Sequence, residues 1–272
     1  ISLLSKYLPY AKYKQVLVGQ AFCTEGPFIE EPWFVISRLD DLIRNHPGFN
    51  ECTPTEEWIS IFIHEYFHLL QLNHRSVSRF MVSKAKNGPF VRQVALENFY
   101  RKHALFRATV EYEHELLKAA LTKGDKLDIK TAIQTLTRWL DIYRSRISTF
   151  SGRFSCANAQ RSLADFDAYW MFIEGLARYV ESQVLINSSY HTEADDLDDE
   201  RFSCFVDWAG KGYNGLPAAN RRCGRRFYYA IGMHVAFLLD IAAPGWKTKV
   251  FSKRRWLVGM VEELTKEQTL TH

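Results

Sequence analysis

The pentapeptide His64-Glu65-Tyr66-Phe67-His68 constrains this 272-residue chain more than any other feature of its sequence. The residues before it are typical of a helix start. Thr53 can cap the helix, Pro54 suits the first turn, and Glu56 and Glu57 complement the positive end of the helix dipole. Apolar residues then recur at helical spacing to about residue 74, so the sequence predicts one helix that carries both histidines.

Side chains four residues apart share one face of a helix, so His64 and His68 can bind one metal ion from the same side. Glu65 lies one step round the helix, where its carboxylate can take a proton from a metal-bound water. The pattern predicts one Zn²⁺ per chain, with the two histidines as ligands and Glu65 as the catalytic base. The alternative is two histidines on a partly buried helix face beside a solvent-facing acid.

A catalytic zinc site needs a third protein ligand and an open fourth position. His74 lies ten residues after His64, which is the spacing of HExxHxxGxxH, but Gln71 occupies the glycine position. The apolar residues around Gln71 predict that the helix continues. A continuous helix places His74 about 15 Å along the axis from His64, beyond reach of the same ion. The sequence therefore favours a third ligand from another segment.

Glu174 is the preferred third ligand, and it lies in the segment Phe172-Ile173-Glu174-Gly175-Leu176-Ala177-Arg178-Tyr179. A carboxylate from a second helix, packed across the first, would complete a site of two histidines and one glutamate. The small residues Gly175 and Ala177 would let the two helices approach closely. Glu181 is the alternative ligand, and the alternative interpretation of Glu174 is a salt-bridged helix acid.

With these two segments the chain resembles the gluzincin metallopeptidases, in which HExxH is followed on a later helix by a glutamate ligand. The resemblance covers residues 64–71 and 174–179 firmly and the rest of the chain only in outline. A further segment, Tyr228-Tyr229-Ala230-Ile231-Gly232, looks like the Tyr-x-x-Gly element of the gluzincin aminopeptidases. That match implies that Tyr229 donates to the oxyanion of the transition state, with Tyr228 and His234 as alternatives.

The expected fold is α+β and zincin-like, in a single domain over residues 1–272. A small N-terminal β-sheet is predicted within residues 1–50, because residues 14–22 and 33–39 are short, β-branched and aromatic segments between turn residues. Residues 51–272 are predicted to be mostly helical. Apolar periodicity and turn residues place these helices at about residues 53–74, 89–121, 130–150, 159–186, 222–241 and 255–267.

This site predicts a zinc metallopeptidase, a hydrolase that cleaves a peptide or protein substrate through a metal-activated water. Two other functions fit the same residues. The zinc could be structural in a binding or regulatory module, with His74, His234 or a cysteine closing the site. The same centre could also hydrolyse an acyl bond that is not a peptide.

Polar groups are expected to hold the second nitrogen of each ligand histidine, and Asp165, Asp167 and Asn73 are the candidates. A charged run on the long helix at 89–121 is interpreted as its wet face rather than as a cation site. That run comprises Glu111, Glu113, His114 and Glu115.

Composition adds few constraints. The formal charge is only +4, and the basic runs at residues 221–226 and 247–255 are interpreted as solvated faces, so no nucleic-acid partner is expected. No apolar run reaches the length of a membrane span. Five cysteines without a CxxC pair argue against a disulfide framework or a thiolate zinc site. The cysteines and the absence of a recognisable signal peptide favour the cytoplasm, and the start at Ile1 predicts missing upstream residues.

Overall fold

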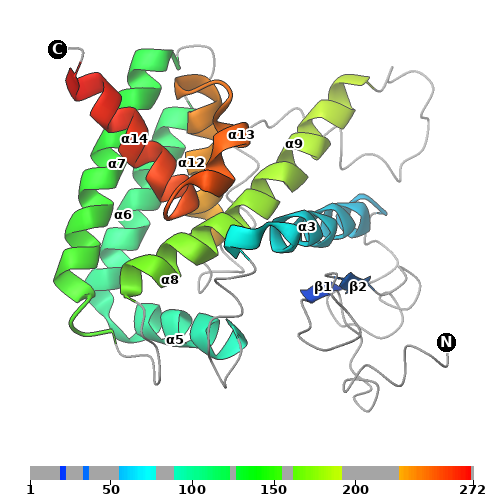
Figure 1. The fold of residues 1–272 in the computed structure, drawn as a ribbon, viewed down its shortest axis with the longest axis horizontal. Coiled ribbons are helices and arrows are strands. Elements are labelled where there is room, and N and C mark those ends of the chain that lie inside the picture. Colours follow the sequence, from blue (N-terminus) through cyan, green and yellow to red (C-terminus); the bar gives the residue numbers. More distant parts are fainter. Residues whose placement is uncertain are drawn as a thin grey trace.

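The computed structural model describes residues 19–22, 33–36, 55–77, 89–122, 127–154, 162–191 and 227–270, and most of them are helical (Figure 1). The α-helices are α3 (Thr55–Asn73), α5 (Pro89–Lys102), α6 (Ala104–Leu121), α7 (Ile129–Phe150), α8 (Leu163–Trp170), α9 (Leu176–His191), α12 (Phe227–Ala242), α13 (Trp246–Lys249) and α14 (Trp256–Leu270). A π-helical turn, η3 (Met171–Gly175), joins α8 to α9, and a 3₁₀ turn, η6 (Val250–Ser252), follows α13.

The predicted α+β class with an N-terminal sheet is wrong, and the protein is helical. Within the described ranges, strands occur only as β1 (Gly19–Phe22) and β2 (Trp33–Ile36), which pair antiparallel with Gly19 opposite Ile36. Two strands of four residues form a hairpin, which is too small to provide a sheet layer against a helical body. Residues 14–18 and 37–39, which were also predicted as strand, lie outside the described residues.

The predicted helices are mostly present, with one clear exception. The single helix expected at residues 89–121 is two helices, because His103 adopts an extended conformation (φ −110°, ψ 95°) between α5 and α6. The helix expected at residues 159–186 begins at Leu163, where the Ser162 side chain accepts a hydrogen bond from the N–H of Asp165. In the same way, the Asp128 side chain caps α7 by accepting from Thr131.

The core lies among α6, α7, α12 and α14, which lie close together in Figure 1. Large side chains fill it, including Phe106, Trp139, Phe150 and Phe237, each at most 2% exposed. Complete burial of an apolar side chain of this size contributes about 1.5–3 kcal/mol, so this bundle provides much of the stability of the fold.

Helices α8, η3 and α9 run on as one long rod that packs against both α12 and α3 (Figure 1). The rod approaches α12 most closely where two glycines meet. A Cβ atom on Gly175 would lie 2.5 Å from the Cα of Gly232, and one on Gly232 would lie 2.1 Å from the carbonyl oxygen of Met171. Only glycine permits backbones this close. The contact fixes the π turn that carries Glu174.

In the parts of the chain that the structure describes, no single helix has both the length and the hydropathy of a membrane span. Helix α12 and the segment Trp246–Ser252 satisfy that test only together, as a pair bent by 119°.

Candidate metal centre

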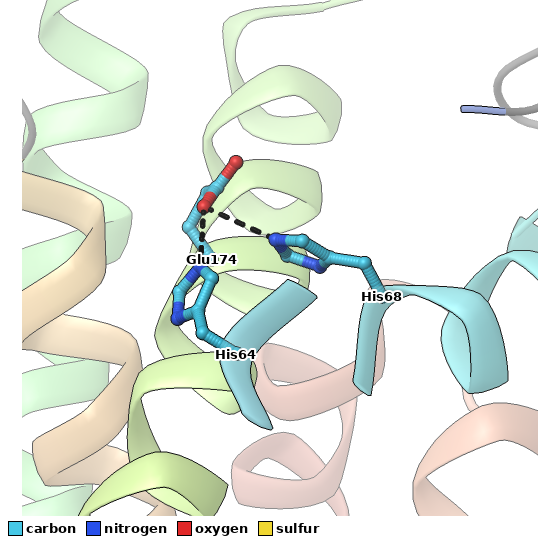
Figure 2. A group of neighbouring side chains, drawn as sticks. All are labelled: His64, His68 and Glu174. Carbon is cyan, nitrogen blue, oxygen red and sulfur yellow. Dashed lines mark hydrogen bonds and ion pairs between the residues drawn. The ribbon is translucent and has the colours of Figure 1, made fainter. Parts of the chain in front are cut away.

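Two histidines of α3 and one glutamate of the π turn converge at the point where α3 meets the long rod (Figure 2). The Oε2 atom of Glu174 lies 3.3 Å from Nε2 of His64 and 3.5 Å from Nε2 of His68. The three ligand atoms lie within 4.8 Å of one another, and each side chain is only 9–12% exposed. The residues predicted as metal ligands are thus close together, from segments about a hundred residues apart in the sequence.

These distances fit a small tetrahedral metal site. Nitrogen and oxygen ligands lie about 2.0–2.2 Å from zinc, so neighbouring ligand atoms in a tetrahedron are separated by about 3.3–3.6 Å. The separations of 3.3 Å and 3.5 Å match that edge length. The contact between Nε2 of His64 and Oε2 of Glu174 is also within hydrogen-bonding distance.

The other nitrogen of each imidazole faces an oxygen atom. Nδ1 of His64 lies 3.3 Å from Oε2 of Glu181, and Nδ1 of His68 lies 2.8 Å from Oε1 of Gln71. An oxygen acceptor at Nδ1 favours the tautomer with its proton there, which leaves the lone pair of Nε2 directed at a metal. Both rings therefore present Nε2 on the side of Glu174.

The groups expected to hold these rings were predicted wrongly. Asp167 pairs with Arg146 at 2.7 Å, and Asp165 contacts Ser162 and Arg255. Asn73 is exposed at the end of α3. Glu181 and Gln71 occupy these roles instead. Both could have been recognised by spacing, because Glu181 lies seven residues after Glu174 on one helix face and Gln71 lies three residues after His68.

Charges at the centre are strongly coupled. Burial lowers the pKa of His64, but hydrogen bonds with Glu174 and Glu181 outweigh it and raise this pKa to about 9. Burial favours the neutral form of Glu174, yet the neighbouring His68 and His64 hold its pKa well below the usual range. Glu181 likewise has its pKa lowered to about 2, against the effect of burial, chiefly by the charge of Arg178 and the hydrogen bond with His64. Arg178 supplies a permanent positive charge to Glu181, whereas the charge beside Glu174 comes from the imidazoles, which either a proton or a metal ion can make positive.

The π turn is the local feature that brings Glu174 to the histidines. Single π turns inside α-helices widen the helix by one residue and recur at functional sites. Here η3 comprises Met171–Gly175, and all five residues are buried against α12 and the neighbouring elements. Apolar spacing predicts a regular helix at this point, and the π turn departs from it.

The two residues proposed for chemistry also lie near the histidines. Glu65 is partly buried and directly follows His64 on α3. The ring of Tyr229, from α12, stacks on the ring of His64 with centroids 5.8 Å apart and planes 15° apart. The role of Tyr229 as an oxyanion donor and the role of Glu65 as a base remain predictions.

The alternatives to Tyr229 have other partners. Tyr228 is completely buried, and its hydroxyl donates to Glu97 at 3.2 Å. His234 stacks on His114 of α6, with ring centroids 5.1 Å apart, and burial lowers its pKa to about 3. The geometry therefore favours Tyr229 among the three candidates.

His74 is separated from the metal-ligand group. Helix α3 continues to Asn73, as the sequence predicted, and His74 follows it on the surface. Its Nδ1 lies 2.9 Å from the hydroxyl of Ser76, and its ring packs on Phe251. The group of three ligands found among the described residues does not include it.

The acidic run on α6 was interpreted in part wrongly. Glu111 and Glu115 are exposed, but Glu113 is completely buried and bonds to Arg146.

The basic run at residues 247–255 agrees better with the predicted solvated face than the acidic run does. In it, Lys247 pairs with Asp240, Lys253 with Glu263 and Arg255 with Asp165. The basic run at residues 221–226 lies outside the described residues.

Comparisons with protein-family models, with curated proteins and with solved structures found no match to this chain. A functional assignment therefore depends on the geometry and chemistry of the candidate centre itself.

Proposed function

We propose that this protein is a zinc-dependent metallopeptidase that binds one Zn²⁺ through His64, His68 and Glu174. The observation that carries the proposal is the convergence of three buried ligand atoms within 4.8 Å, with the Glu174 oxygen at tetrahedral edge distances from both imidazole nitrogens. The donor set also fits zinc, which takes imidazole nitrogen and carboxylate oxygen together. Three protein ligands leave the fourth position for water or substrate, as catalytic zinc requires.

Each residue then has a distinct role in peptide hydrolysis. A bound zinc ion supplies a Lewis acid that polarises a carbonyl group and acidifies water. Glu65 accepts the proton of the attacking water and passes it to the leaving amine. Tyr229, which stacks on His64, donates a hydrogen bond to the oxyanion that develops in the transition state. Glu181 and Gln71 hold the two imidazoles.

The proposal is tested first by measuring zinc per chain for the wild type, Glu174→Ala and His74→Ala, purified side by side. We expect close to one zinc in the wild type and in His74→Ala, and a sharp loss in Glu174→Ala. His74→Ala is the matched control, because it removes a histidine from the same end of α3 without touching the ligand group. A wild-type protein that takes up no zinc would contradict the proposal.

The reaction is tested by digesting a peptide library and identifying the products by mass spectrometry. Wild-type protein loaded with zinc should cleave peptides, and Glu65→Gln should retain zinc while losing about 10²–10⁴-fold in rate. Tyr229→Phe should retain zinc and lose about 10²–10³-fold. Zinc-loaded protein that cleaves no peptide would favour the structural-zinc or non-peptide hydrolase alternative instead.

A further inference from the structure

We infer that Gln71 is a positioning residue that links the two ligand-bearing helices and so sets the geometry of the zinc site. The inference rests on the proposed function, because it concerns the same centre. Gln71 lies on α3, three residues after His68, and it is completely buried. A buried amide requires partners for both its oxygen and its nitrogen, so its contacts define what it does.

The side-chain amide of Gln71 contacts both halves of the site. Its Oε1 atom lies 2.8 Å from Nδ1 of His68. Its Nε2 atom donates to the carbonyl oxygens of Phe172 at 2.9 Å and Ile173 at 3.1 Å. Two carbonyl acceptors require the amide nitrogen on their side, so the oxygen must face His68. That oxygen in turn requires the His68 proton on Nδ1, which keeps Nε2 available for the metal.

The Nε2 atom of Gln71 contacts the π turn immediately before Glu174. The N–H of Leu176 is shared between the carbonyl groups of Ile173 and Phe172, the same two groups that accept from Gln71. Gln71 supplies the additional donors at this buried position, where an unsatisfied carbonyl group would be costly. One amide therefore orients the His68 ring and holds the backbone from which Glu174 projects.

Glutamine meets a requirement here that few residues can. The position needs an acceptor on one side and two donated hydrogen bonds on the other, and only a side-chain amide offers both. A glutamate would accept from His68 but would set its charge against two carbonyl oxygens. A leucine of similar size would fulfil neither role. These differences provide the variants that separate positioning from simple packing.

The test compares zinc affinity in the wild type, Gln71→Glu and Gln71→Leu, measured by competition with a chromogenic chelator. Removing a group that holds a ligand histidine weakens metal affinity by about 10–100-fold, so we expect a loss in that range for Gln71→Leu. Gln71→Glu retains the contact with His68, so it should lose less zinc affinity than Gln71→Leu. It also provides the test if Gln71→Leu does not fold. Visible absorption of the cobalt-substituted proteins should change in both variants, because it reports ligand geometry.

The matched control is Thr135→Val, which removes a buried side-chain hydrogen bond to the Thr131 carbonyl within α7. It should lower the stability of the metal-free protein and leave zinc affinity and the cobalt spectrum unchanged. Gln71 variants that behave in the same way would overturn the inference and leave the proposed function standing. A wild type that binds no zinc would overturn both.

Discussion

Two buried clusters of charge lie along the same rod of helix, and they obtain their positive charge in different ways. In the first, on α6, α7 and α8, Arg146 binds Glu113 and Asp167, at 2.5 Å and 2.7 Å. In the second, where α3 meets the π turn and α9, the carboxylates of Glu174 and Glu181 face His64. Glu181 also pairs with Arg178 at 2.5 Å, but among the described residues Glu174 faces only the two histidines. An arginine is charged at every physiological pH, whereas a histidine is charged only when protonated.

In the arginine cluster, a side chain of the protein itself, Arg146, supplies the positive charge. Arg146 uses its Nε and one terminal nitrogen on Glu113, which also accepts from Trp139 at 3.2 Å. The guanidinium lies over the ring of Phe106, 4.9 Å from its centroid. Burial raises the pKa of both acids, and the charge of Arg146 only partly opposes this. Both oxygens of Glu113 and Oδ2 of Asp167 are thus directed at a permanent cation, whereas Oδ1 of Asp167 has no hydrogen-bond partner among the described residues.

The histidine cluster differs because its imidazole nitrogens can exchange a proton for a metal. His64 and His68 each have one nitrogen held by an oxygen and the other directed at Glu174. Comparison of the two clusters shows that burial and charge alone do not distinguish a cluster of ion pairs from the proposed metal site. The deciding property is whether the positive charge that faces the carboxylate, here Glu174, is permanent or can be supplied from solution.

The largest expected effect is on the arginine cluster. Arg146→Met should lower the free energy of unfolding by about 3–5 kcal/mol, because it leaves Glu113 and Asp167 buried without a cation. Urea unfolding with the metal-free protein measures this loss. Glu113→Gln in the Arg146→Met background should recover part of it. A loss below about 1 kcal/mol would mean that the cluster is not the closed ion pair described here.

The second prediction concerns zinc itself. Free zinc at a hundred times its Kd should stabilise the wild type by about 2.7 kcal/mol, since the metal binds only the folded chain. Glu174→Ala should gain almost nothing at the same zinc concentration, as shown by thermal unfolding with and without metal. Equal stabilisation of both proteins would place the metal elsewhere and remove the distinction between the two clusters.

The third prediction uses the glycine contact beside the π turn. Gly232→Ala should destabilise the protein by about 1–3 kcal/mol, because the new Cβ would lie 2.1 Å from the Met171 carbonyl oxygen. It should also weaken zinc binding, since the clash displaces the turn that carries Glu174. Gly152→Ala is the control, because no atom lies within 4 Å of its Cβ. Gly232→Ala with wild-type stability and zinc affinity would contradict the account of the turn.

The smallest expected effect is the change in the free energy of unfolding when the pH rises by one unit. Because His64 has a pKa of about 9 in the metal-free fold and about 6.5 when unfolded, its contribution to stability is complete below pH 6.5. That contribution is lost as the pH rises from 6.5 through 9, by at most about 1.4 kcal/mol per unit. Glu181, with its pKa lowered to about 2, contributes above pH 4.5 and loses this contribution as the pH falls through 2.

Urea unfolding in the presence of a chelator, at pH 6.5, 7.5 and 8.5, measures the alkaline slope. Glu181→Gln should flatten it, because the variant removes one of the carboxylates that hold the proton on His64. Stability that stays constant or rises across this window would show that His64 is not held by the two acids.

Local patterns in the sequence were sufficient for several elements. The cap and periodicity around HExxH predicted α3, and the continued helix through Gln71 kept His74 away from the ligand group. Asp128 caps α7, which spans the residues expected from periodicity. These features depend on contacts between residues near one another in the chain, which is why the sequence alone determined them.

Tertiary structure decided the rest. The α+β expectation failed because the strand-like segments form only a short hairpin among the described residues, and the core is built from helices. The break at His103 and the π turn at Met171–Gly175 are local departures from a helical pattern that periodicity does not signal. The charged run in the sequence indicated that Glu113 is a surface acid, but the fold places Arg146, from another helix, beside it. Spacing proposed His64, His68 and Glu174, but only the packing of α3 against the long rod brings their ligand atoms within 4.8 Å of one another. Gly175, expected to let these two helices approach, instead meets Gly232 of α12.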